Sequence, residues 1–163
     1  TYWSTLSLTG ESLKVIKLPE EARPDGTNVT IPTNAVPVRL EFADAVNGNC
    51  VWSHQVPVGA SSISLLRIWV IREVAANVRL DVTVTRFSLS NGATSASDAN
   101  SETIAVSAVD GAIEALTINS AAYNGLSFSA GDIIGVRILR DGGNAADTYN
   151  ATWKVVAFEI TFA

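Results

Sequence analysis

Few residues in this sequence have side chains that commonly do chemistry, and they are scattered along the chain. His54 is the only histidine and alternates with Trp52 in a strand-like run, while Cys50 is the only cysteine. A zinc site needs several such ligands, and the Gly-x-Ser-x-Gly turn that carries many nucleophilic serines is absent here. We therefore predict no catalytic residues, no disulfide within the chain, and a structural or surface role for His54.

Three oxygen-bearing side chains recur at three-residue spacing near the end of the chain: Asp141, Asn144 and Asp147. Their carboxylate and carbonyl oxygens could serve calcium, which accepts flexible sites of this kind. The spacing does not match an EF-hand loop, and capping of a plain turn by Asx side chains explains the same residues. We favour the turn, predict no metal, and keep calcium as the weaker alternative.

The sixteen acidic residues could include a carboxylate pair of the glycosidase type, because such a pair need only meet in space. Asp25 and Asp110 lie in turn sequences, however, and Asp81 occupies an outward position in a strand-like run. Gly142-Gly143 is no phosphate loop either, since a strand rather than a helix follows it. We therefore predict that the protein is not an enzyme and binds no cofactor.

The aromatic residues raise the question of a sugar-stacking platform, because the chain has four tryptophans and three tyrosines. Trp52, Trp69 and Trp153 lie within strand-like runs, where core packing is the commoner use of a large ring. Tyr2 and Trp3 lie near the N-terminus with little local core to enter. We predict them as interface residues that dock on a neighbouring subunit or on their own domain.

The elements that must position these side chains are strands. Val78, Leu80, Val82 and Val84 alternate with polar residues, and the same period of two recurs from Val36 to Phe42. In the last run, Val156, Phe158, Ile160 and Phe162 are expected on one face. The segment Ile63 to Val74 fits a buried helix or a strand, and its Ile and Val content favours a strand. The polar residues 88–101 are predicted to be a long exposed loop.

About eight strand-like segments separated by turn sequences are typical of a sandwich or jelly roll. The sequence therefore predicts an all-β fold, a two-sheet antiparallel jelly-roll-type sandwich over residues 36–163. Residues 1–35 contain several prolines and are predicted to be an extended N-terminal arm that packs on the domain or on a neighbouring subunit.

Composition excludes two classes of partner. The chain has 47% hydrophobic and 17% charged residues and a net charge of −5, without a basic stripe, so we expect no nucleic-acid binding. No apolar run approaches the roughly 20 residues that cross a bilayer, and we expect no membrane contact. A surface poor in charge suits packing against other proteins, so a homo-oligomer is expected.

The segment from Phe128 to Phe162 resembles the end of jelly-roll domains in tailed-bacteriophage virion proteins. There a Gly-Asp opens a strand, an Arg-x-x-Arg-Asp closes it, and Ala-Asp-Thr-Tyr precedes the final strand. The matching residues here are Gly131, Asp132, Arg137, Arg140, Asp141 and Asp147. We expect these to be structural residues, with Arg137 and Arg140 paired to Asp132, Asp141 or Asp147.

The resemblance implies a virion component. Its leading form is a capsid cement or decoration protein, a homotrimer on the capsid surface that binds the major capsid protein and stabilises the head shell. The alternative is a tail, fibre or baseplate module that binds a host receptor or carbohydrate. The small size, the polar surface and the N-terminal arm favour the cement protein in this reading.

Overall fold

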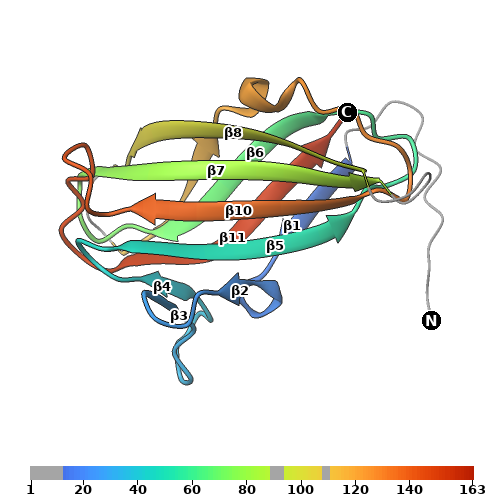
Figure 1. Ribbon diagram of the computed structural model, residues 1–163. Coiled ribbons are helices and arrows are strands. Elements are labelled where there is room, and N and C mark those ends of the chain that lie inside the picture. The colour runs from blue at the N-terminus through green and yellow to red at the C-terminus, as the bar shows by residue number, and fades with distance from the viewer. Residues whose placement is uncertain (1–12, 89–93, 108–110) are drawn as a thin grey trace.

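The computed structural model describes residues 13–88, 94–107 and 111–163 (Figure 1). Its strands are β1 (Leu13–Lys17), β2 (Arg23–Pro24), β3 (Val29–Thr30), β4 (Leu40–Phe42), β5 (Asn47–Gln55), β6 (Ile63–Ile71), β7 (Asn77–Ser88), β8 (Thr94–Ala105), β9 (Ile113–Ile118), β10 (Ile133–Asp141) and β11 (Trp153–Phe162). Two short 3-10 helices, η1 (Pro19–Glu21) and η2 (Ser120–Tyr123), are the helices within these ranges. Neither is long and apolar enough to cross a membrane.

The strands form two antiparallel sheets that pack face to face (Figure 1). Sheet A has the order β3-β4-β11-β6-β9, and β1 also pairs with β11. Sheet B has the order β2-β5-β10-β7-β8. From β4 to β7 and again from β8 to β11, each strand lies in the opposite sheet to the one before it. The predicted all-β, two-sheet jelly-roll-type sandwich is thus confirmed.

The core lies between the two sheets, where every second side chain of a strand points inward. Val78, Leu80, Val82 and Val84 of β7 all have 0% exposure and face the partner sheet. Burying such a side chain contributes roughly 1.5–3 kcal/mol to stability. One aromatic pair joins the sheets, because the rings of Trp52 in β5 and Phe158 in β11 stack with centroids 5.2 Å apart and planes 11° apart.

The segment predicted as a long loop, residues 88–101, is largely strand. β8 pairs with β7 along its whole length, from Thr94 opposite Ser88 to Ala105 opposite Asn77. As the last strand of sheet B, β8 has inward side chains that are only half-buried, among them Ala96, Asp98 and Asn100. The loop prediction was wrong because an edge strand needs little hydrophobicity, and charged residues there also discourage pairing with other chains.

The last strand departs from strict alternation. A bulge between Val155 and Ala157 shifts the register of β11 against β6. Val155 is therefore buried at 1% exposure, whereas Val156 is half-buried and does not share the inward face with Phe158. The extra residue of a bulge changes which side chains point inward, which the sequence pattern alone did not indicate.

The described part of the expected N-terminal arm belongs to both sheets. β1 pairs with β11 and β3 with β4 in sheet A, whereas β2 pairs with β5 in sheet B. β2 and β3 have two residues each, as expected for a stretch rich in proline. The predicted interface residues Tyr2 and Trp3 lie outside the described residues.

Candidate functional site

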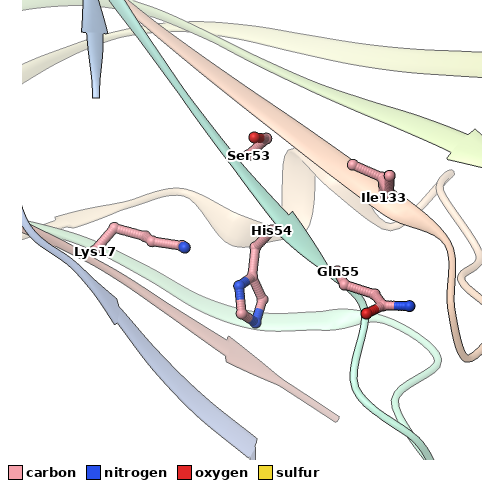
Figure 2. A pocket seen from close by; sticks show the side chains of 5 residues that line it. All are labelled: Lys17, Ser53, His54, Gln55 and Ile133. Carbon is pink, nitrogen blue, oxygen red and sulfur yellow. The ribbon is translucent and has the colours of Figure 1, made fainter. Parts of the chain in front are cut away.

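An open depression of about 430 Å³ lies at one edge of the sandwich, where β5 runs beside β1. Its lining residues are Lys17, Ser53, His54, Gln55 and Ile133 (Figure 2). The depression forms there because β2 pairs only with Cys50 and Val51, so that it does not cover the following residues of β5. Alternation along β5 then directs Ser53 and Gln55 to the outer face of sheet B and His54 toward sheet A.

The polar side chains of the depression are open to a ligand. The side chains of Ser53, His54 and Gln55 have no hydrogen-bond partner within the described ranges. Lys17 donates one bond, 3.0 Å long, to Glu21 Oε1 and retains further donor capacity. The depression is thus lined by a hydroxyl, an imidazole, an amide and an ammonium group, which together can donate and accept hydrogen bonds.

The charge state of His54 follows from its surroundings. Burial lowers the pKa of the imidazole, the positive charge of Lys17 lowers it further, and the negative charge of Glu21 opposes these effects. Figure 2 shows the Lys17 side chain extending from β1 toward His54. A neutral imidazole at pH 7 offers one donor and one acceptor, and both can bond a hydroxyl-bearing ligand.

An exposed aromatic ring lies next to the depression on the outer face of sheet B. Phe87 of β7 is 45% exposed and pairs with Ile133, which in turn pairs with Gln55. Gly135 occupies the next outward position on β10, and a Cβ placed there would lie 3.6 Å from Phe87 Cε2. The glycine thus leaves the space beside the ring open. An apolar ring bordered by free polar groups is a common arrangement in small-molecule sites.

Sequence reasoning missed this area. It considered the tryptophans as possible platforms, but Trp52 and Trp153 are buried in the core, and Trp69 donates its ring N–H to Glu159 at 3.0 Å. The signal for Phe87 was present in the alternation of β7, because the ring follows the outward residues Thr83 and Thr85 at the same spacing.

The loop suspected of calcium binding is held by other contacts. Both Asp147 carboxylate oxygens accept hydrogen bonds from Arg140, at 3.0 and 2.9 Å, while Asn144 donates to Asp141 at 3.0 Å. Within the described ranges there is no group of three or more His, Cys, Asp or Glu side chains that could hold a metal. The loop therefore has the side-chain bonds of a capped turn.

Gly131, Asp132 and Arg137 of the C-terminal motif take no part in the Arg140–Asp147 pair. Gly131 has φ +89 in the turn before β10, and Asp132 accepts a bond from the Ser129 N–H at 3.0 Å. Arg137 is exposed on the outer face of sheet B, and its side chain has no ion pair or hydrogen bond within the part that the structure describes. The structure therefore pairs Arg140 with an aspartate but leaves Arg137 free.

Comparison with known proteins gives no family. No protein-family model and no curated protein matches the sequence. Solved structures do share the fold: a family 35 carbohydrate-binding module from Clostridium thermocellum has a TM-score of 0.52 at 16% identity, covering 93% of this chain and 99% of that one. CBM35 from Cellvibrio japonicus Abf62 has a TM-score of 0.54 at 14% identity, with 91% and 92% coverage.

A third similar structure is the Podospora anserina GH26-CBM35 β-(1,4)-mannanase, with a TM-score of 0.55 at 14% identity. The match covers 92% of this chain but only 28% of the mannanase, so the likeness is to one part of a larger enzyme. At these identities the comparisons establish the jelly-roll fold.

These neighbours contradict the capsid cement prediction, which was wrong. They are carbohydrate-binding modules, and the carbohydrate-binding part of the alternative prediction fits them better. The residues that carry the resemblance to virion proteins serve the fold here: Gly131 makes a turn, and Arg140 holds the loop that contains Asp147. Residues that serve the fold do not by themselves indicate a function.

Proposed function

We propose that this chain is a non-catalytic carbohydrate-binding module whose sugar site is the depression at β5 together with the ring of Phe87. The observation that carries the proposal is the set of unpartnered polar side chains, Ser53, His54 and Gln55, beside an exposed ring. The shared fold with carbohydrate-binding modules supports it.

The arrangement matches the chemistry of a sugar. A pyranose has an apolar C–H face that can stack on Phe87, and hydroxyl groups at its rim that both donate and accept hydrogen bonds. Gln55 lies in the same cross-strand row as Phe87, two strands away, and Ser53 lies opposite Gly135 in the next row. A sugar seated on the ring therefore brings its hydroxyl groups toward the amide and the serine.

The expected affinity is modest. Each net hydrogen bond contributes roughly 0.5–1.5 kcal/mol, and a partly exposed ring buries only part of the sugar. A few such contacts give a binding free energy of ~4–8 kcal/mol, which corresponds to millimolar to micromolar dissociation constants. Binding of a polysaccharide, where the site can be filled from many positions, will be easier to detect than binding of a monosaccharide.

The lack of carboxyl groups among the residues that line the depression supports a binding role. Glycoside hydrolases commonly use two carboxyl groups roughly 5–10 Å apart on either side of the scissile bond. The residues that line the depression include no aspartate or glutamate. Glu21, which accepts a hydrogen bond from Lys17, also accepts one from the Leu18 N–H.

The test is a glycan array followed by affinity electrophoresis in gels that contain the best polysaccharides. Phe87→Ala and Gln55→Ala are expected to weaken binding at least about 5-fold, which corresponds to ~1 kcal/mol. Ile113→Ala is the matched control, because Ile113 is 52% exposed and lies on β9 of the other sheet. A protein that retains no glycan, or one that binds equally well without Phe87 and Gln55, would refute the proposal.

A further inference from the structure

Two arginines lie side by side on the outer face of sheet B. Arg23 of β2 pairs with Val51 of β5, and Arg137 of β10 pairs with Val51 from the other side. Residues that pair across antiparallel strands point to the same face, so the three side chains form one row. Both arginines are exposed, and Val51 is half-buried between them.

These two arginines differ from the other basic residues. Neither guanidinium group has an ion pair or hydrogen bond within the described ranges. The remaining lysines and arginines each bond a carboxylate, a hydroxyl or a carbonyl, as Lys17 bonds Glu21, Arg39 bonds Glu41, and Lys154 bonds Glu73. In a chain of net charge −5, neither arginine is thus paired with an acid of the described ranges.

The geometry of the row suits an anionic group. Strands two apart in a sheet are separated by roughly 9.5 Å, and arginine side chains are long enough to converge across that distance. Each guanidinium presents a planar fork that binds carboxylate or sulfate through two hydrogen bonds. An anion held between the two forks would also relieve their mutual repulsion, and Val51 supplies an apolar floor.

The row is continuous with the proposed sugar site. Ser53 and Gly135 form the next row along β5 and β10, and Gln55 and Ile133 form the row after that, next to Phe87. Successive rows on one face lie about 6.7 Å apart, so the arginines and Phe87 belong to one strip of surface. A glycan of more than one sugar could therefore contact both.

We propose that the ligand is an acidic glycan, in which a carboxylate or sulfate of a sugar next to the one on Phe87 binds Arg23 and Arg137. This inference rests on the proposed function and adds the class of sugar. Nucleic acid fits the surface less well, because two arginines make no phosphate-tracking stripe and Asp81 lies on the same face one row beyond Arg137.

The experiment compares matched polymers that differ in charge. Polygalacturonate is paired with its methyl ester and dextran sulfate with dextran, so that the carboxylate and sulfate arms are read separately. Affinity electrophoresis of the full chain is repeated with Arg23→Gln, Arg137→Gln and the double variant. Arg39→Gln is the control, because it removes the same charge from an arginine that is paired to Glu41.

The expected result is tighter retention by at least one acidic polymer than by its neutral partner. Each single variant should lose roughly 10-fold in affinity for that polymer, and Arg39→Gln less than 2-fold. Thermal unfolding of each variant reports whether the fold is kept.

Three results would overturn the inference. Retention by neutral polymers alone, unchanged in the double variant, refutes the acidic ligand but leaves the proposed function standing. Retention by no polymer refutes both. Equal retention by duplex DNA and the acidic glycans would mean that the row attracts any anion, and would also refute the inference.

Discussion

Arg140 and Asp147 form a buried ion pair between the end of β10 and the loop that follows it. Their side chains are 0% and 2% exposed, and Arg140 Nη2 lies 2.9 Å from Asp147 Oδ1. Arg140 also donates to the carbonyls of Ala43 and Ala151, at 3.2 and 2.9 Å. One arginine thus connects the segment before β5, the loop after β10 and the start of β11.

Removing the carboxylate should cost much of the stability. Asp147→Ala leaves the buried guanidinium without its main counter-charge, because Asp44 is 44% exposed and 3.5 Å away. The free energy of unfolding is expected to fall by about 3 kcal/mol or more, measured by urea denaturation. Asp141→Ala is the control and should cost under ~1 kcal/mol. Similar losses in both variants would contradict this role for Asp147.

The two adjacent glycines in the same loop should differ sharply. A Cβ at Gly142 would lie 2.6 Å from the Val46 carbonyl oxygen, whereas one at Gly143 would have its nearest neighbour, Asn47 Oδ1, at 3.7 Å. Gly142→Ala therefore requires the backbone to move and should destabilise by roughly 1–3 kcal/mol. Gly143→Ala should change stability by less than ~0.5 kcal/mol. Equal melting temperatures for the two variants would show that this close approach is unimportant.

The fold could be predicted from the sequence because its central strands are strictly periodic. In β7, the buried side chains of Val78, Leu80, Val82 and Val84 alternate with polar residues. This pattern predicts a half-buried strand. The sequence-based prediction was wrong in two strands where the alternation of apolar and polar residues is weak or interrupted. β8 is a polar edge strand, and the bulge at Val156 resets the alternation of β11 without any marker in the sequence.

The candidate site was harder to predict because it is assembled across strands. Arg23 and Arg137 are more than a hundred positions apart, and only their shared partner Val51 makes them neighbours. The position of Phe87 indicates a site only once the register shows that Ile133 lies between it and Gln55. Strand order and register, which sequence alone did not supply, decide which polar residues share a face.

The only histidine provides a direct probe of the depression. Burial and then Lys17 lower the pKa of His54, so its ring protons should titrate below the usual value of about 6.5 in an NMR experiment. Lys17→Gln should move the midpoint upward, whereas Lys154→Gln, which alters a lysine paired with Glu73, should not. An unchanged midpoint in Lys17→Gln would contradict the proximity of the two side chains.

The same shift predicts how stability depends on pH. The unfolded chain has an ordinary imidazole and so binds the proton more readily than the folded protein does. The contribution of His54 to the free energy of unfolding should therefore fall as the pH is lowered from about 6.5 through the folded-state pKa. His54→Gln should flatten the pH profile in that window, and an equally steep profile in the variant would assign the dependence to other groups.

A substitution at Gly135 can distinguish an effect on stability from an effect on glycan binding. It lies in the middle of β10, where glycine costs roughly 0.5–1 kcal/mol relative to alanine, and a Cβ there would make only ordinary contact with Phe87. Gly135→Val should therefore leave the unfolding free energy equal or higher. It should also weaken glycan binding at least about 5-fold, because the added methyl groups occupy the space beside the ring.

Ser101→Val is the control for this substitution, since it adds a similar side chain to an exposed position on β8, outside the sugar site. Calorimetry and affinity electrophoresis on the two variants give stability and binding separately. If Gly135→Val is as stable as the parent and binds glycan as well, the surface beside Phe87 is not where the sugar lies. If it is stable and fails to bind, the glycine is retained at that position for the ligand, because the strand would be better served by a larger residue.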